Sequence, residues 1–305
     1  MRIFVTGATG FLGSYLVADL IGHGHDVAVL LRPGADPWRI AGSLSRLTAI
    51  AGDFDQVDSL RGPLSTFQPE AVAHLAWRGV GNTDRNSPIQ AQNIPDTLDL
   101  AAVSIEAGAR VFVGAGSQAE YGRYSRAIRE SDIPRPTTLY GRAKLAADAM
   151  AGQLCAERGA RFAWLRIFST YGPMDAPHWL IPSMIRTLKQ GKRMPLTRCE
   201  QRWGFLHARD AASAFRLALT RDDAEGVFNL GSSEAPPLHE TVTTLRDLVN
   251  SNAELGFGDI PYRPDQVMIL QADVRRLEAL GWRPQIGLEE GLSETVTWYN
   301  AHQRN

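Results

Sequence analysis

Short apolar runs alternate with amphipathic segments along most of the chain. The mainly apolar runs indicate buried β-strands, several of them bounded by glycine. Between the runs, apolar residues recur every three or four positions, which predicts helices. The predicted strands are 2–6, 27–31, 48–51, 71–75, 110–114, 161–167 and 226–230. The predicted helices include 13–21, 96–107, 140–157, 180–190 and 241–251.

This alternation predicts an α/β protein. Consecutive strand–helix–strand units give a mostly parallel sheet with helices on both faces, and right-handed crossovers make it a Rossmann-type doubly wound sheet. After Pro173 prolines and aromatic residues become frequent and helices dominate. We therefore expect a smaller C-terminal substrate lobe, interleaved with the sheet because strand 226–230 returns to it. The expected dinucleotide-binding domain is 1–172 with 203–232, and the expected substrate lobe is 173–202 with 233–305.

Composition and charge narrow the class of protein. The 305 residues are 44% hydrophobic and 21% charged, which is ordinary for a globular protein. A net charge of −1 gives no general attraction to nucleic acid or anionic membrane. We see no signal peptide and no apolar stretch of the roughly 18 residues that a membrane span needs. The expectation is a soluble cytoplasmic protein that binds neither nucleic acid nor membrane.

The cysteines and histidines do not suggest a metal site. Cys155 and Cys199 are the only cysteines, too few for a disulfide framework or a cysteine metal site. No H-x-x-x-H or C-x-x-C spacing occurs. The sequence therefore predicts no bound metal.

A glycine-rich turn joins the first predicted strand to the first predicted helix. Its G-x-x-G-x-x-G spacing differs by one residue from the general dinucleotide fingerprint. Glycines let backbone N–H groups approach a pyrophosphate, and the helix N-terminus favours the negative charge. The cofactor-binding candidates in this turn are Gly7, Thr9, Gly10, Phe11, Leu12 and Gly13.

The end of the second predicted strand indicates which dinucleotide is bound. An acid at this position binds the ribose 2′-hydroxyl of NAD. Here Leu31 takes that position and Arg32 follows it. An arginine can form a bidentate contact with the 2′-phosphate of NADP. We therefore expect a preference for NADP(H), with NAD as the other possibility and a surface role as the plain alternative for Arg32.

Three residues downstream form a candidate reactive set. Tyr140 and Lys144 are four residues apart in a predicted helix and so share one face of it. A phenol has a pKa near 10 and is a poor base, and a nearby ammonium lowers that pKa. Ser117 follows a predicted strand, where its hydroxyl can hold the substrate oxygen. Ser117, Tyr140 and Lys144 are therefore the predicted catalytic residues.

With these motifs the chain resembles the extended short-chain dehydrogenase/reductase family of nucleotide-sugar epimerases, dehydratases and 4-ketoreductases. The resemblance extends over nearly the whole chain. Its motif segments are Gly52-Asp53-Phe54, His74-Leu75-Ala76-Trp77, Ser117-Gln118-Ala119-Glu120-Tyr121-Gly122, Leu165-Arg166-Ile167-Phe168-Ser169-Thr170-Tyr171-Gly172-Pro173, Arg202 with Gly204-Phe205-Leu206-His207 and Asp210-Ala211-Ala212, Arg263-Pro264-Asp265 and Leu280-Gly281-Trp282-Arg283-Pro284.

The resemblance implies roles for residues that the pattern alone does not assign. It implies that Arg202 and Arg263 contact the diphosphate of a sugar nucleotide, a role that suits the fork geometry of arginine. The cofactor residues that it adds are Asp53 and Phe54 at the adenine, then Leu75, Ala76, Trp77 and Phe168, with Tyr140 and Lys144 also contacting the cofactor. The substrate residues that we expect are Ser117, Gln118, Glu120, Ser169, His178, Arg202 and Arg263.

Departures from the family pattern narrow the reaction. Gln118-Ala119 stands where the 4,6-dehydratases carry Asp-Glu, which argues against a dehydratase. Ala119 also replaces the Cys of the epimerase-reductases that make fucose donors, which argues against a C3/C5 epimerisation. Ser169 replaces the usual asparagine, which puts one diphosphate contact in doubt.

The sequence leaves the roles of two residues, Glu120 and His178, open. Glu120 is an additional carboxylate that either contacts the sugar or is a solvated acid. His178 lies in a loop after Tyr171-Gly172-Pro173, where it either contacts the sugar, as a hydrogen-bonding group or proton donor, or is an ordinary loop or packed histidine.

Three functions compete at this point. The first is NADP(H)-dependent reduction of an NDP-4-keto-6-deoxy sugar at C4, with Tyr140 as the acid. The second is an NDP-sugar 4-epimerase with tightly bound NAD, and the third is a non-catalytic dinucleotide sensor on the same scaffold. Leu31-Arg32 favours the first, and the intact reactive set argues against the third. Helices 96–107 and 140–157 resemble those of the family's dimer bundle, so we expect a homodimer that binds a nucleotide-linked sugar.

Overall fold

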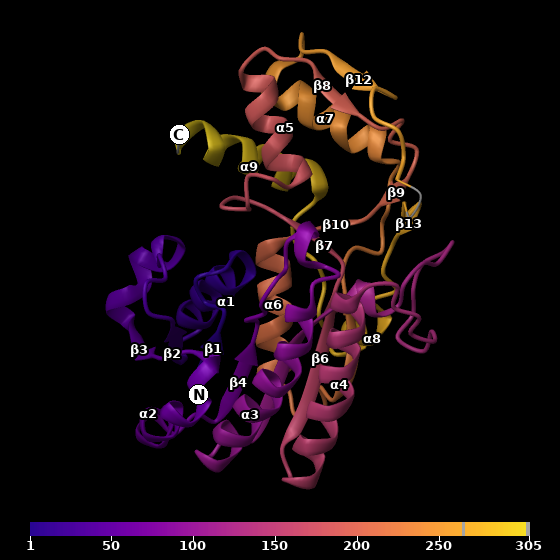
Figure 1. Cartoon of the computed structure of the whole chain (residues 1–305). Coiled ribbons are helices and arrows are strands. Elements are labelled where there is room, and N and C mark those ends of the chain that lie inside the picture. Colours follow the sequence, from indigo (N-terminus) through magenta and orange to yellow (C-terminus); the bar gives the residue numbers. More distant parts are fainter. Residues whose placement is uncertain (264–265, 303–305) are drawn as a thin grey trace.

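The computed structural model describes residues 1–263 and 266–302 and confirms the predicted α/β fold. All seven predicted strands join one seven-stranded parallel sheet, in the order β11-β6-β5-β4-β1-β2-β3 (Figure 1). Its strands are β1 (Arg2–Thr6), β2 (Asp26–Leu31), β3 (Leu47–Ala51), β4 (Ala71–His74), β5 (Val111–Ser117), β6 (Arg161–Ile167) and β11 (Gly226–Leu230). Ser117 is thus the last residue of β5 rather than a residue beyond it.

The strand order creates a crevice at one edge of the sheet. All neighbouring strands are parallel, so their carboxyl ends lie at the same edge. β1 pairs with β2 on one side and with β4 on the other, so the chain reverses its direction of progress across the sheet there. Ligands of doubly wound sheets bind outside the strands at such a switch point.

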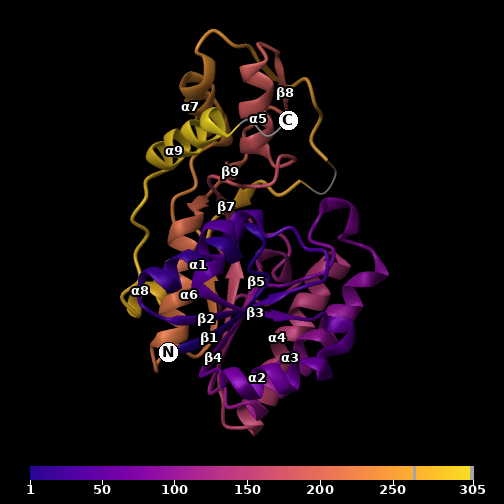
Figure 2. The same cartoon turned by 90° about the vertical axis from the view of Figure 1, so that its left-hand side faces the viewer.

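Helices cover both faces of the sheet (Figures 1 and 2). Alternate strand residues point to opposite faces, so Ile3 and Val5 join a core with α1 and α6, whereas Phe4 joins a core with α2, α3 and α4. Fully burying a side chain of this size stabilises the fold by about 1.5–3 kcal/mol. These helices are α1 (Phe11–Gly22), α2 (Arg61–Phe67), α3 (Asn93–Glu106), α4 (Leu139–Glu157) and α6 (Ala208–Thr220).

The short helices and the remaining strands lie mostly in connections. The 3₁₀ helices are η1 (Trp38–Arg46), η2 (Phe54–Leu60), η3 (Asn82–Asp84), η4 (Pro88–Gln92) and η5 (Gln118–Glu120). The short strands form the parallel pairs β7 (Ser169–Tyr171) with β10 (Phe205–His207), β8 (Met194–Leu196) with β12 (Leu255–Phe257), and β9 (Arg202–Trp203) with β13 (Ile269–Leu270).

A second group of elements lies beyond the carboxyl edge of the sheet, at the top of Figure 1. It contains β8, β12, α5 (Leu180–Lys189), α7 (Leu238–Asn250) and α9 (Leu288–Ala301). These helices share a hydrophobic core of their own, to which Met184, Leu245 and Leu292 contribute. Both α5 and α7 were predicted: α5 ends one residue before its predicted end, and α7 begins three residues before its predicted start and ends one residue before its predicted end.

Between α7 and α9 the chain returns to the sheet. Helix α8 (Arg275–Ala279) lies beside β11, where Arg276 donates to the Val227 carbonyl. Trp282 is buried, and its indole N–H lies 3.2 Å from the Asp210 carbonyl. The segment around α8 therefore packs with the sheet, although the sequence places it in the lobe. In the described part of the chain, none of the helices has the length and apolar character needed to cross a membrane.

Candidate active site

The turn between β1 and α1 is so tightly packed that two of its positions require glycine. Gly7 has a φ of +74°, and a Cβ built on it would lie 2.6 Å from the backbone nitrogen of Ala76. A Cβ on Gly13 would overlap the carbonyl oxygen of Gly7. A side chain at either position would push the turn away from β4 or from α1, so the glycines keep the turn at the switch point of the sheet.

The first turn of α1 presents backbone N–H groups that no described side chain caps. The N-cap residue is Gly10, and the first turn carries no acidic residue. Uncapped N–H groups and the positive end of the helix dipole favour a phosphate at this position. The turn from Gly7 to Gly13 therefore fits the pyrophosphate of a dinucleotide, with Thr9, Phe11 and Leu12 completing it.

A buried histidine fixes the strand ends beneath this turn. The Thr97 hydroxyl donates to the Asn93 carbonyl, so it accepts from His74 Nε2 at 3.1 Å. His74 Nδ1 then accepts from the Thr6 hydroxyl at 2.8 Å. Burial and the charge of Lys144 lower the pKa of His74 to about 3, so the ring is neutral. His74 thus holds the end of β4 to β1 and to α3, directly before Leu75, Ala76 and Trp77.

Asp53 offers a buried acceptor at the predicted adenine position. It precedes η2 directly after β3, and its Oδ1 has no hydrogen-bond partner among the residues that the structure describes. Arg78 Nη2 lies 3.6 Å away and donates instead to Asp55 at 2.9 Å. A buried acceptor without a donor is costly unless a ligand supplies one. Asp53 therefore fits the exocyclic amine of an adenine, and the Phe54 ring packs edge-on against His74.

Two arginines follow β2. Arg32 comes directly after the strand and is exposed. Arg39 in η1 is one that the sequence interpretation missed. Its Nη1 donates to the Thr9 carbonyl at 3.2 Å, and its Nε donates to the Met174 carbonyl at 3.0 Å. The signal for Arg39 was absent from the sequence, because the residues that it contacts are 30 and 135 positions away.

Helix α4 docks closely on the end of β5. Thr138 caps the helix by accepting from the Gly141 N–H at 3.1 Å. A Cβ on Gly141 would overlap the carbonyl oxygen of Ala119. Glycine at this position therefore lets the first turn of α4 approach η5, which brings Tyr140 to Ser117. Burial raises the pKa of Tyr140, and the nearby Ser117 side chain acts in the opposite direction.

A cation that the sequence interpretation missed lies over Tyr140. The guanidinium carbon of Arg85 is 5.4 Å from the centre of the phenol ring, and the Arg85 carbonyl accepts from the Tyr140 N–H at 2.9 Å. Burial raises the pKa of Tyr140, and the charge of Arg85 opposes this shift. Arg85 was not selected because it lies 55 positions before Tyr140 in a loop without a recognisable motif.

Lys144 is buried beneath the same helix face, with a side chain only 3% exposed. Its Nζ donates to the Ala115 carbonyl at 2.5 Å and lies 3.5 Å from the centre of the Trp77 ring. Burial lowers the pKa of Lys144 to about 7, and the negative charge of Glu120 opposes this shift. Near pH 7 the Lys144 amine is therefore only partly protonated.

Glu120 corrects one expectation, because it is neither a solvated acid nor a group that faces a substrate. Its side chain is 0% exposed. Oε1 accepts from the Ser117 N–H at 2.8 Å and from the Trp164 indole at 3.1 Å, and Oε2 accepts from Arg166 Nε at 2.6 Å. The carboxylate is thus satisfied by protein donors inside the fold. Its position behind Ser117 reflects the burial of η5 between β6 and α4.

The other predicted substrate residues lie at the sheet edge and in the upper part of the molecule. Gln118 and Ser169 are half-buried at the starts of η5 and β7. Phe168 is buried and packs 6.4 Å from the Tyr121 ring. His178 is exposed and lies 4.8 Å from the Trp179 ring, as an ordinary loop histidine would.

The two arginines predicted at the diphosphate are both exposed. Arg202 begins β9, whose partner β13 follows the loop that contains Arg263. The rest of the Arg263 motif, Pro264 and Asp265, lies outside the described residues.

The connection from β7 to the upper part is held by three side chains from three different elements. The carbonyls of Pro173, Met174 and Asp175 accept, in order, from the Tyr15 hydroxyl at 2.8 Å, from Arg39 Nε at 3.0 Å and from the Tyr299 hydroxyl at 2.7 Å. Tyr15 belongs to α1 and Tyr299 to α9. The glycine turn, η1 and the upper helices are thereby tied to one backbone segment.

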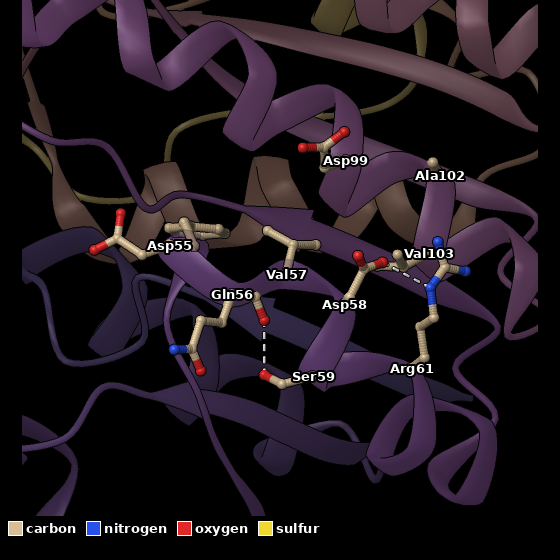
Figure 3. Close-up of a pocket in the computed structure, with 10 residues that line it drawn as sticks. Asp55, Gln56, Val57, Asp58, Ser59, Arg61, Asp99, Ala102 and Val103 are labelled. Atoms are coloured by element: carbon tan, nitrogen blue, oxygen red, sulfur yellow. Dashed lines mark hydrogen bonds and ion pairs between the residues drawn. The ribbon is translucent and has the colours of Figure 1, made fainter.

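A surface hollow of about 560 Å³ lies between η2 and α3 (Figure 3). Asp55, Asp58 and Asp99 line it, and Arg61 pairs with Asp58 at 2.8 Å. Its lining includes Phe54, whereas Ser117, Tyr140 and Lys144 lie elsewhere. Among the described residues, no group of three or more His, Cys, Asp or Glu side chains is arranged to hold a metal ion.

Comparison with known proteins finds relatives over nearly the whole chain. The chain is 28% identical to a dTDP-glucose 4,6-dehydratase of Streptomyces griseus, over 99% of this chain and 95% of that protein. It is 27% identical to a GDP-6-deoxy-D-mannose reductase of Pseudomonas aeruginosa, over 99% of this chain and 98% of that one. The structure of a UDP-glucose 4-epimerase of Thermus thermophilus in complex with NAD is 25% identical, with a TM-score of 0.87, over 98% of this chain and 99% of that chain.

These relatives share a class of substrate while differing in the reaction. Residues 3–231 also match the pattern of the NAD dependent epimerase/dehydratase family, and this range contains all of the sheet except Arg2. The resemblance expected from the motifs is thereby confirmed. The chain belongs to the NAD dependent epimerase/dehydratase family, whose members similar to it act on nucleotide sugars as epimerases, dehydratases and reductases.

Proposed function

We propose that the protein reduces an NDP-4-keto-6-deoxy sugar at C4 with NADP(H). The observation that carries the proposal is the Ser117–Tyr140–Lys144 set, together with a β2 end that has no acid. Ser117 ends β5 at the carboxyl edge of the sheet and its side chain acts on the pKa of Tyr140, and the turn that fits a pyrophosphate lies at the same edge. The dehydratase similarity does not extend to the residues after Ser117, because Gln118-Ala119 offers no acid for the elimination of water.

Each residue of the set has one task in this reaction. The bound dinucleotide supplies a hydride. Ser117 donates a hydrogen bond that holds the keto oxygen of the sugar. Tyr140 donates the proton that this oxygen needs as it becomes a hydroxyl, and its raised pKa keeps the phenol protonated at neutral pH. Lys144 contacts the nicotinamide ribose and, when protonated, favours the phenolate that is left behind.

Cofactor preference follows from the end of β2. Leu31 closes the strand and cannot accept a hydrogen bond from a ribose 2′-hydroxyl. Arg32 is exposed directly beyond it and suits a 2′-phosphate through bidentate contacts. Asp53, Phe54, Leu75, Ala76, Trp77 and Phe168 are the remaining residues that we propose for the cofactor site.

The substrate is proposed from chemistry and similarity. The reductase of Pseudomonas aeruginosa is named for a GDP-6-deoxy sugar. Arg202 and Arg263 are exposed cations in the part of the chain after Pro173, which we propose to bind the substrate. Their fork geometry suits the diphosphate of a sugar nucleotide. We propose Gln118, Ser169 and His178 as further contacts for the sugar nucleotide.

A second candidate, an NDP-sugar 4-epimerase with tightly bound NAD, is favoured by one observation. The similar Thermus thermophilus UDP-glucose 4-epimerase, which was solved with NAD, spans nearly the whole chain at a TM-score of 0.87. An epimerase would use the same three residues in both directions, with Tyr140 alternately accepting and donating the proton. The residues at the end of β2 argue against an epimerase. An epimerase returns the hydride to its substrate within each turnover, so it does not consume NADPH.

Three further proposals concern the assembly. We propose a homodimer through α3 and α4, which lie together on one face of the sheet, and a cytoplasmic location. We also propose that residues 1–172 and 203–232 bind the dinucleotide and that 173–202 and 233–305 bind the substrate, with the α8 segment packing on the first part. Residues 264, 265 and 303–305 of that second range lie outside the described residues.

The test combines cofactor identification with an assay. Mass spectrometry of nucleotide released from the denatured protein, with fluorescence titrations of NADPH and NADH, comes first. Weak retention with NADPH preferred, and NADPH oxidation on addition of a dTDP- or GDP-4-keto-6-deoxy sugar, is the expected result. Tyr140→Phe is the matched control: it should keep the NADPH titration and lose turnover. Tightly retained NAD with interconversion of UDP-hexoses would establish the epimerase instead.

A further inference from the structure

Behind Ser117 the sheet contains a buried polar cluster, formed by Glu120, Asp148, Trp164 and Arg166. Arg166 lies between the two carboxylates, with Nε 2.6 Å from Glu120 Oε2 and Nη2 3.0 Å from Asp148 Oδ2. All four side chains are at least nine-tenths buried. Burying these charges costs desolvation energy, so a buried ion pair stabilises a fold little. Stabilisation of the fold is therefore not a sufficient explanation for the cluster.

The backbone of β5 is shaped to admit this cluster. Gly114 stands opposite Trp164 and Gly116 stands opposite Arg166 in the β5–β6 register. A Cβ on Gly114 would overlap the Trp164 ring, and a Cβ on Gly116 would lie 2.8 Å from Glu120 Oε1. The two glycines of the strand therefore leave a slot that seats the indole and lets its N–H reach the Glu120 carboxylate.

The cluster ends on Ser117 through a reciprocal capping arrangement. Glu120 Oε1 accepts from the Ser117 backbone N–H at 2.8 Å, and the Ser117 hydroxyl oxygen accepts from the Ala119 N–H at 3.2 Å. Both backbone donors at the start of η5 are thereby satisfied, as in a capping box. Because its oxygen accepts from the Ala119 N–H, the Ser117 hydroxyl keeps its proton free to donate, and Ser117 lies close enough to Tyr140 to lower the pKa of the phenol.

We propose that Glu120 is a positioning residue, which holds the Ser117 N–H from inside the sheet and so directs the Ser117 hydroxyl toward Tyr140. Trp164 and Arg166 fix the carboxylate from the β6 side. Asp148 shares Arg166 but has no contact with Ser117 among the described hydrogen bonds. This proposal rests on the proposed function, since it takes Ser117 and Tyr140 as the residues that hold and protonate the substrate oxygen.

Glu120 also affects the protonation of two predicted catalytic residues. This is a second reason to propose Glu120, rather than Asp148, as the positioning residue. Its charge raises the pKa of both Tyr140 and Lys144. Asp148 has a pKa raised to about 7 by burial, so it is partly protonated at neutral pH. Burial raises the pKa of Glu120, and the charge of Arg166 and the hydrogen bonds from Trp164 and Ser117 oppose this shift.

The test separates position from charge and from folding. Glu120→Asp keeps the negative charge opposite Arg166 but withdraws the carboxylate by one methylene from the Ser117 N–H. We expect kcat to fall about 10-fold or more with KM values for NADPH and sugar within about 3-fold, because only the reacting geometry is disturbed. Asp148→Asn is the matched control, and it should keep kcat within about 3-fold, since it leaves the capping contact intact.

A double-mutant cycle decides whether Glu120 acts through the Ser117 hydroxyl. If it does, the combined Ser117→Ala, Glu120→Asp protein is no slower than Ser117→Ala alone. Losses in kcat that multiply would show an independent role and overturn the proposal. Trp164→Phe, which removes the indole N–H that fixes Glu120 Oε1, takes the place of Glu120→Asp in the cycle if the latter does not fold.

A crystal structure of the Glu120 variant gives an answer that needs no substrate. We expect the Ser117 side chain to leave the rotamer that contacts Tyr140 or to occupy more than one. An unchanged Ser117–Tyr140 contact in that structure would overturn the proposal even if activity falls. Absence of turnover in the wild-type protein would instead refute the proposed function, while this structural result would still decide the role of Glu120.

Discussion

The ammonium of Lys144 lies against the face of the Trp77 indole, with Nζ 3.5 Å from the ring centre. Trp77 in turn meets Tyr140 edge-to-face at 6.2 Å and donates to Gln90 at 2.9 Å, so the ring is fixed from both sides. The face of an indole ring attracts a cation, and this attraction replaces part of the hydration energy that a buried ammonium loses. Trp77 therefore supports a charged lysine in a site that otherwise favours a neutral one.

We predict that Lys144→Met stabilises the folded protein while removing activity. The pKa of Lys144 is lowered by burial to about 7, so between about pH 7 and 10.5 the unfolded chain binds more protons than the folded one. Wild-type stability therefore rises with pH across this window, and the cost of the buried charge is full below pH 7. Removing the charge should raise the free energy of unfolding at pH 7 by roughly 1–3 kcal/mol.

Denaturant unfolding at pH 7 and at pH 10, with NADPH titration and turnover, checks this prediction. The gain over wild type should shrink at the higher pH, and NADPH binding should weaken together with kcat. Lys192→Met, a change of an exposed lysine, is the control, and it should leave the free energy of unfolding, NADPH binding and kcat unchanged. A Lys144→Met protein that is less stable at pH 7, or that turns over normally, would contradict the expectation.

Arg85 should set the pH dependence of Tyr140. Its positive charge lowers the pKa of the phenol, so Arg85→Gln should raise that pKa further. Reduction needs the protonated phenol, so the loss of activity at high pH should move to higher pH in the variant. Oxidation of the product alcohol needs the phenolate, and its rate at pH 7 should fall by roughly 3- to 10-fold.

The measurement is the pH profile of kcat in both directions for three proteins. Arg85→Lys keeps a cation over the ring and should stay close to the wild-type profile. Profiles of Arg85→Gln that coincide with the wild type in both directions would remove Arg85 from the reaction site.

Arg32 carries the expected cofactor preference. Arg32→Asp replaces a cation that suits a 2′-phosphate with an acid that suits a ribose 2′-hydroxyl. The ratio of NADPH to NADH affinity should fall by about 10-fold or more, because the change both removes an attraction and adds a repulsion. Fluorescence titration with the two cofactors measures this ratio directly, and Arg110→Asp is the control at an exposed site in another loop. An unchanged ratio would refute the assignment of Arg32.

The parts of the fold that the sequence predicted are those with local signals. Buried parallel strands are continuous apolar runs, so each of the seven sheet strands could be located, and β5 was misjudged only by three residues at its end. The Gly7–Gly13 turn and the four-residue spacing of Tyr140 and Lys144 are local as well. Helix α6 was not assigned, although Ala211, Phe215 and Ala218 recur at helical spacing on its buried face.

The features that escaped prediction depend on distant contacts. Glu120 was expected at the sugar or in water, because the residues that bury it, Trp164 and Arg166, follow 44 and 46 positions later. Arg39 and Arg85 had no local pattern that distinguishes them from the other arginines. Side chains of this kind become visible only when the sheet order fixes which loops meet at its edge.

Asp175 provides the last prediction, since it is an acid buried at the connection that Tyr15, Arg39 and Tyr299 hold. Burial raises its pKa to about 7, while the Ala176 N–H and the charge of Arg39 oppose the shift. Between about pH 4 and 7 the folded chain therefore binds more protons than the unfolded one, and its stability falls as pH rises. Asp175→Asn removes this loss, and the variant should exceed the wild type by roughly 1–3 kcal/mol at pH 8 while matching it near pH 4. Urea unfolding of both proteins at the two pH values measures the difference, with the exposed Asp222→Asn as the control. A difference that is the same at pH 4 and at pH 8 would mean that Asp175 is ionised in the folded protein throughout, held by Arg39 more strongly than burial opposes it.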